Sequence, residues 1–102
     1  MRRLFAAALI AGALGWSGWA MAGSCEGTVV GLSNTYNLQR GTGFLAIRAR
    51  PTIHSRMVGQ TFNGNLLEID RRRGSWLFVF DHGSGKSGWV HHRYVRRGCD
   101  GV

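Results

Sequence analysis

The stretch GKSGWVHHRYV, residues 85–95, is the most informative part of this chain about its fold. Its glycines mark turns, and Trp89 and Val90 form a short strand in which successive side chains point to opposite faces. Val90 is therefore expected to fill the interior, with Trp89 partly covering it. The closing HHRYV is long enough for one helical turn and no more, so His91 and His92 are expected to lie largely exposed on that turn.

The rest of the chain is also divided into short pieces, mainly by glycine. Apolar and basic residues alternate in GFLAIRAR (43–50), and WLFVF (76–80) is the most β-prone run. LLEID (66–70) is expected to end in a charged turn, RRRGS (71–75), and DHGSGKSG (81–88) is typical of a hairpin loop. None of the pieces has apolar residues at helical period. We therefore expect an all-β fold, a small barrel or sandwich.

The first 22 residues have the composition of a cleaved signal peptide. Two arginines precede an apolar run (4–19) that ends before an A-x-A cleavage signal at 20–22. The alternative is a transmembrane anchor, but the run is shorter than the ~20 apolar residues that a bilayer requires. We expect cleavage after Ala22 and a periplasmic or secreted protein with no transmembrane anchor.

The charge balance is strongly basic. The chain has 13 Lys and Arg against five Asp and Glu, which gives a net charge of +8. Loss of Arg2 and Arg3 with the signal peptide lowers this charge to +6. Such a balance favours anionic partners, including cell-wall polymers and lipid headgroups. Export argues against nucleic acid as the ordinary partner.

Cys25 and Cys99, the only two cysteines, lie near opposite ends of the mature chain. In an oxidising compartment such a pair usually forms a disulfide. Closing so long a loop would stabilise the fold by about 4 kcal/mol in the chain-entropy model. The alternative is a lipoprotein, because AGSC (22–25) is a poor lipobox whose lipidation at Cys25 would leave Cys99 unpaired.

Taken in order, the pieces resemble a bacterial SH3 domain over residues 43–96. The family pattern runs approximately LNVRSGPSTSYKVIGTLKKGTKVTV…NGWYKV…GKTGWVSSSYL. It is similar, piece by piece, to FLAIRARPTIHSRMVGQTFNGNLLEIDRRRGSWLFVFDHGSGKSGWVHHRYV in this chain. One departure is Arg50, which stands where the family usually has glycine before the proline.

The resemblance implies an SH3-like barrel of five to seven short strands with one terminal 3₁₀ turn. The expected organisation is a signal peptide (1–22), an N-terminal extension tethered by the disulfide (23–42), the barrel (43–97) and a short tail (98–102). The extension is expected to add a strand or a tethered arm.

The family consists mostly of binding modules that act beside cell-wall enzymes. The resemblance therefore implies a non-catalytic envelope module that recognises peptidoglycan peptides or an anionic envelope polymer, without a cofactor. The alternative is a periplasmic adaptor that binds another protein and has no wall affinity. A shallow groove is expected between the loop at 49–57, the turn at 71–75 and the final turn at 91–95. The candidate ligand-binding residues are aromatic or basic: Tyr36, Arg50, Arg71, Arg72, Arg73, Trp76, Trp89, His91 and Tyr94.

The arginines have two interpretations. Arg71, Arg72 and Arg73 form an anion-binding patch with other basic residues, or they form a solvated turn that keeps the domain soluble. The other members of such a patch would be Arg48, Arg50, Arg93, Arg96 and Arg97.

Neither a metal site nor an enzyme active site is expected. Adjacent histidines in a strand face apart, and His54 and His82 lie on distant loops, whereas a metal site needs three or four converging ligands. Asp81, His82 and Ser84 contain the residue types of a nucleophilic triad. They lie at a glycine-rich loop tip, which is more typical of a hydrogen-bonded turn.

Overall fold

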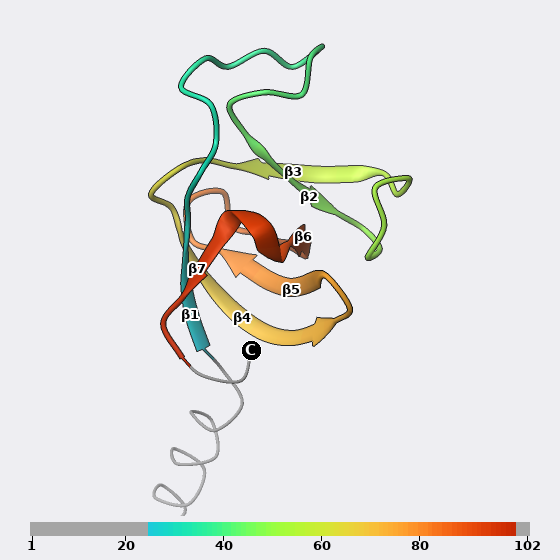
Figure 1. Ribbon diagram of the computed structural model, residues 1–102. Helices are drawn as coiled ribbons and strands as arrows, with labels where there is room; N and C mark the ends of the chain where they lie inside the picture. Colours follow the sequence, from blue (N-terminus) through green and yellow to red (C-terminus); the bar gives the residue numbers. More distant parts are fainter. Residues whose placement is uncertain (1–24, 100–102) are drawn as a thin grey trace, which may run out of the picture.

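The computed structural model describes residues 25–99, so the predicted signal peptide lies outside the described residues (Figure 1). The expected all-β fold with one 3₁₀ turn is confirmed. No helix in residues 25–99 is long and apolar enough to cross a membrane. The elements are β1 (Cys25–Val29), β2 (Leu45–Arg48), β3 (Met57–Thr61), β4 (Leu66–Arg73), β5 (Trp76–Asp81), β6 (Lys86–His91), the 3₁₀ turn η1 (His92–Tyr94) and β7 (Val95–Arg97).

All seven strands belong to one antiparallel sheet, ordered β3-β2-β6-β5-β4-β1-β7. Figure 1 shows the sheet curled into a small barrel, with η1 between β6 and β7. Strand β1 comes from the N-terminal extension and lies between β4 and β7. The extension therefore contributes a strand to the sheet, and the loop that follows it reaches beyond β2 and β3.

The core follows from the alternation of side chains along each strand. In β5, Leu77 and Val79 are fully buried, while Trp76, Phe78 and Phe80 alternate with them and are at least partly exposed. The expectation that Val90 fills the interior is confirmed, because its side chain has no exposed surface. The buried apolar residues that form one cluster are Cys25, Val29, Leu45, Ile47, Leu67, Ile69, Leu77, Val79, Val90 and Val95.

The arginine run was expected to be a turn, and this expectation is wrong. Strand β4 continues through Arg73, and the turn itself is only Gly74-Ser75. A register shift at Asp70 places Arg71 opposite Phe78. The Arg71 guanidinium then lies 4.3 Å from the centroid of the Phe78 ring. An arginine can occupy such a strand position because its stem packs on apolar surface while its charge stays in contact with an aromatic face and water.

The last hairpin departs from expectation at its two histidines. Trp89, which was expected to cover the interior partly, is buried, with only 7% of its surface exposed. Its ring packs edge-on against Phe78 at 5.3 Å and lies beneath the Arg71 guanidinium. His91 and His92 are half-buried, not largely exposed, and their rings stack at 5.1 Å. They stack because η1 begins between them, so they do not alternate as they would in a continuous strand.

A buried carboxylate organises the β5–β6 hairpin. Asp81 has no exposed surface and accepts hydrogen bonds from the hydroxyls of Thr61 (3.0 Å) and Ser84 (2.6 Å). The Ser84 N–H also donates to this carboxylate at 3.0 Å. Asp81 and Ser84 therefore form the hydrogen-bonded turn that the glycine-rich sequence predicted.

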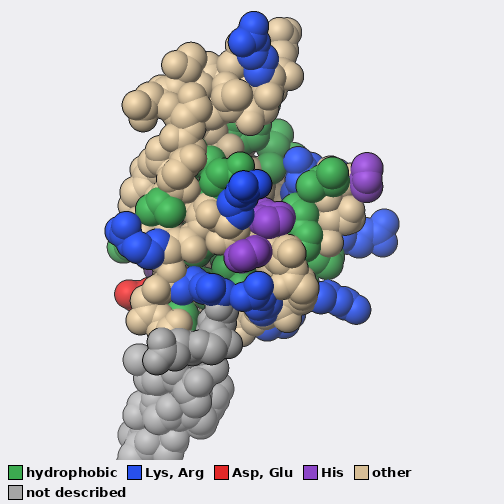
Figure 2. Space-filling model, viewed as in Figure 1, with side chains coloured by type: hydrophobic (Ala, Val, Ile, Leu, Met, Phe, Trp, Pro, Cys, Tyr) green, Lys and Arg blue, Asp and Glu red, His purple; other side chains and the backbone are tan. Residues whose placement is uncertain are grey.

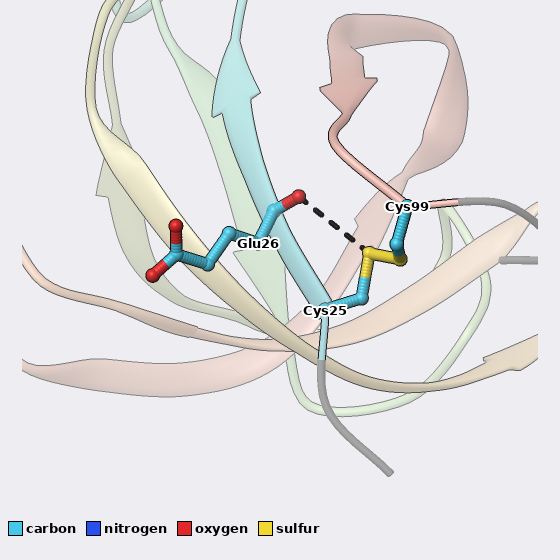
Figure 3. Close-up of a disulfide and its surroundings, with 3 residues drawn as sticks. All are labelled: Cys25, Glu26 and Cys99. Carbon is cyan, nitrogen blue, oxygen red and sulfur yellow. Dashed lines mark hydrogen bonds between the residues drawn. A yellow bond between two sulfur atoms is a disulfide. The ribbon is translucent and has the colours of Figure 1, made fainter. Parts of the chain in front are cut away.

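A disulfide joins the beginning of β1 to the segment after β7 (Figure 3). It links Cys25 to Cys99, whose Cα atoms are 5.8 Å apart. Beside it, the Gly98 N–H donates to the carbonyl oxygen of Glu26 at 2.8 Å. The disulfide thus holds the start of the extension against the barrel and lies one strand-length away from the loop at 31–44.

Candidate ligand-binding groove

A groove of about 480 Å³ lies between the extension and the face of the barrel that carries η1. One wall comes from residues 31–33 and 41–43, and the other from the ends of β5 and β6 and from η1. Figure 2 shows histidine and basic side chains gathered with apolar ones on this face, where acidic side chains are scarce. The lining residues are Gly31, Leu32, Ser33, Gly41, Thr42, Gly43, Phe44, Leu45, Ala46, Arg48, Ile53, Trp76, His91, Arg93 and Tyr94.

Backbone and amide hydrogen bonds hold the extension wall in place. The Val30 N–H donates to the Tyr94 carbonyl at 2.9 Å, which joins the extension to η1. Asn63, in the β3–β4 turn, binds Leu32 twice. Its Oδ1 accepts from the Leu32 N–H, and its Nδ2 donates to the Leu32 carbonyl, both at 3.0 Å. These bonds fix the backbone of the wall at Val30 and Leu32.

The far end of the wall depends on close contact between Gly43 and Tyr36. Gly43 has a φ of 81°, and a Cβ at this position would lie 2.6 Å from the Tyr36 Cα. Only glycine therefore fits there. Tyr36 packs against Phe44 and Phe62, with ring centroids 5.6 and 6.1 Å away, and its hydroxyl donates to Gln60 Oε1 at 3.0 Å. Tyr36 thus braces the extension from outside the groove.

The barrel wall combines aromatic and cationic side chains. Trp76 and His91 face each other across β5 and β6, with their rings edge-to-face at 5.3 Å. His91 Nδ1 accepts from the Arg93 N–H at 3.2 Å, so a neutral His91 carries its proton on Nε2. The Arg93 guanidinium lies 6.0 Å from the Tyr94 ring centroid. This wall offers flat apolar surface beside hydrogen-bond donors.

The floor and the outer lip come from β2 and the loop after it. Arg48 Nη1 donates to the Ser55 carbonyl at 2.8 Å, which fixes its guanidinium and ties the loop to β2. Ile53, at the tip of that loop, is 65% exposed. No acidic side chain is among the described residues that line the groove. A ligand with carboxylates and some apolar surface would therefore complement it.

The candidate residues from the sequence divide between the groove and other surfaces. Trp76, His91 and Tyr94 come together in the groove, whereas Tyr36 lies behind its extension wall. The remaining five do not line the groove: Arg50, Arg71, Arg72, Arg73 and Trp89.

Two arginines of β4 form contacts with their sequence neighbours. Arg71 forms an exposed ion pair with Asp70 at 2.6 Å. Arg72 Nε donates to the Gly74 carbonyl at 2.7 Å. The backbone of Arg73 is paired with that of Trp76 across β4 and β5. This pairing places the end of the arginine run beside Trp76, which lines the groove.

Sequence reasoning missed several residues that line the groove. Leu32, Phe44 and Ile53 were not candidates, and Arg48 and Arg93 were considered only as members of a basic patch. Phe44 could have been found, because an aromatic residue immediately before an alternating strand has a fixed direction. Leu32 could not, because the path of the extension depends on Asn63, which is distant in sequence.

The electrostatic environment at η1 favours neutral histidine. Burial is the largest cause that lowers the pKa of His92 from its ordinary value of 6.5. The positive charge of Arg72 adds to this lowering, as do His91, Arg97 and Arg93. A further positive charge is therefore disfavoured at His92, which is adjacent in sequence to two residues that line the groove, His91 and Arg93.

The residues that the structure describes form neither a metal site nor a nucleophilic triad. No group of three His, Cys, Asp or Glu side chains within residues 25–99 is placed to hold a metal ion. The partner of His82 Nε2 is the carboxylate of Glu68, at 3.0 Å, and not Ser84. Asp81 holds Ser84 directly, so no histidine lies between the carboxylate and the hydroxyl as nucleophilic catalysis requires.

Comparison with known families identifies one match. The family model for the bacterial SH3 domain matches residues 43–96, more than half of the chain. No curated protein matches the chain. The match begins at the end of the extension and covers β2 to β7 except for its last residue. The chain belongs to the bacterial SH3 domain family.

Proposed function

We propose that this protein is a non-catalytic envelope module whose groove binds short peptides that carry free carboxylates, such as the peptides of peptidoglycan. The observation that carries the proposal is the groove itself. Its volume of about 480 Å³ lies within the ~300–1,000 Å³ that is usual for ligand sites. Aromatic side chains form one wall, and guanidinium groups lie at its floor and rim.

The charges of the groove support an acidic ligand. Arg48 is held in place by Ser55, so little side-chain entropy remains to be lost when its other N–H groups bind a carboxylate. Arg93 also lines the groove. Guanidinium–carboxylate hydrogen bonds are stronger than neutral ones, and they strengthen further beside surfaces that exclude water.

Family membership supports a binding role. Bacterial SH3 domains are commonly binding modules, typically without catalytic activity, and they often bind cell-wall components or proteins. They are often associated with the envelope, and a disulfide between Cys25 and Cys99 suits an oxidising compartment outside the cytoplasm.

The test is retention of the oxidised protein on purified peptidoglycan sacculi over a salt series. Groove binding predicts retention that persists at 1 M salt, where charges more than ~3 Å apart are screened. Trp76→Ala should abolish retention. Phe80→Ala, which removes another outward aromatic of β5 that does not line the groove, should not.

Two results would contradict the proposal. In the first, both variants and the parent protein lose retention at moderate salt. This would mean that the arginine charge alone attracts the protein to the cell wall. Absence of retention at every salt concentration would favour a protein partner, which crosslinking in the envelope would then identify.

A further inference from the structure

The extension wall lies outside the segment that the family model matches. Five groove residues precede the segment that the family model matches, which starts at residue 43. They are Gly31, Leu32, Ser33, Gly41 and Thr42. The barrel supplies the other lining residues. A groove with two walls therefore exists only because residues 31–42 fold back beside β2.

This wall is rigidly braced at separate points. Asn63 holds Leu32 by two hydrogen bonds, and Tyr94 holds Val30 by one. Within the loop, Asn37 and Thr42 exchange backbone hydrogen bonds at 2.9 and 3.1 Å. A surface that is ordered before binding loses little conformational entropy when a ligand arrives.

The two walls differ in chemistry. The barrel wall is aromatic and cationic, whereas the extension wall has no charged side chain among its lining residues. The Thr42 hydroxyl is already engaged with the Thr35 carbonyl, and the Ser33 hydroxyl accepts from the Thr35 N–H. The extension wall thus presents small, uncharged groups and backbone toward a ligand whose charges face the barrel.

We infer that residues 31–42 are a specificity-determining wall: they confine an acidic peptide with its carboxylates toward Arg48 and Arg93 and its uncharged side toward the extension. The inference rests on the proposed function and adds the orientation of the ligand and the segment that selects it. A negative charge on this wall should be incompatible with such a ligand.

The test compares two variants that change net charge identically. Ser33→Asp places a carboxylate on the wall, where it can still accept from the Thr35 N–H as the serine hydroxyl does. Asn34→Asp places the same charge on the next residue, which does not line the groove. The probe is the mixture of soluble peptides released from sacculi by amidase, and affinity is measured by calorimetry.

We expect Ser33→Asp to weaken peptide binding about tenfold, because like charges would face each other in a partly enclosed site. Asn34→Asp should change affinity less than twofold. Thermal unfolding of both variants reports whether the fold is retained.

Trp76→Ala separates failure of this inference from failure of the proposed function. If Trp76→Ala weakens binding while Ser33→Asp and Asn34→Asp behave alike, the wall has no selective role and the groove assignment stands. If none of the three variants weakens binding, the groove itself is not the ligand site and both proposals are overturned.

Discussion

Removal of the Asp81 carboxylate should be the most damaging single change outside the apolar core. The carboxylate has no exposed surface and accepts five hydrogen bonds in the described structure. Three are short, from the Thr61 hydroxyl, the Ser84 N–H and the Ser84 hydroxyl, at 3.0, 3.0 and 2.6 Å. The other two, from Asn65 and Gly83, are 3.4 and 3.3 Å long.

The magnitude follows from what Asp81→Ala leaves behind. Hydrogen bonds to a charged group contribute about 1.5–3 kcal/mol each, but bonds that share one acceptor are not additive. Thr61 also has no exposed surface, so its hydroxyl would be left without a partner at a further cost of about 1–3 kcal/mol. We therefore expect the free energy of unfolding to fall by about 3–5 kcal/mol, a large part of the 5–15 kcal/mol that is usual for a domain.

The assay is urea unfolding followed by tryptophan fluorescence, with Asp70→Ala as the control. Asp70 is also an aspartate on a strand, but it is exposed and forms only a surface ion pair, so its loss should cost less than about 1 kcal/mol. Ser84→Ala, which removes one hydroxyl donor and retains the Ser84 N–H, should lie between the two. If Asp81→Ala and Asp70→Ala lose the same stability within error, the carboxylate does not organise the hairpin as argued here.

Three other perturbations have defined outcomes. Reduction of the Cys25–Cys99 disulfide, which closes a loop with a separation of 74 residues, should lower stability by about 4 kcal/mol in urea unfolding; an unchanged midpoint would refute a role for it. Gly43→Ala should lower the free energy of unfolding by about 2–3 kcal/mol, because its Cβ would meet the Tyr36 backbone. Gly41→Ala, at a φ of 73° and with open space around the Cβ, should lower it by about 1 kcal/mol. Equal losses would contradict the packing argument. The lowered pKa of His92 means that the unfolded state binds more protons than the folded state as pH falls below about 6.5. The stability advantage of the parent protein over His92→Gln should therefore decline from pH 7.5 to pH 5. A difference that is constant with pH would disprove this environment of His92.

The sequence predicted the parts of the fold that depend on local alternation. Val90 is buried because it alternates with Trp89 in a strand that must have one inner face. The sequence offered nine aromatic or basic candidates without separating them, and Trp76, His91 and Tyr94 are three of these. These three do line the groove.

The parts that could not be predicted depend on pairing between distant residues. The arginine run reads as a turn because three charged residues precede glycine, yet pairing with β5 extends the strand through Arg73. A register shift at Asp70 cannot be recognised from composition. Likewise, the extension was expected to add a strand or a tethered arm, and its path beside the barrel depends on Asn63, which holds the backbone of Leu32.

Binding in the groove can be tested residue by residue if ¹⁵N-labelled, oxidised protein is titrated with soluble peptidoglycan peptides and followed by NMR. Binding in the groove predicts the largest shift changes at the Trp76 indole N–H and at the backbone amides of Thr42, Phe44 and Arg93, on both walls together. Changes confined to Arg71 and its strand neighbours, or no changes at millimolar peptide, would contradict the account.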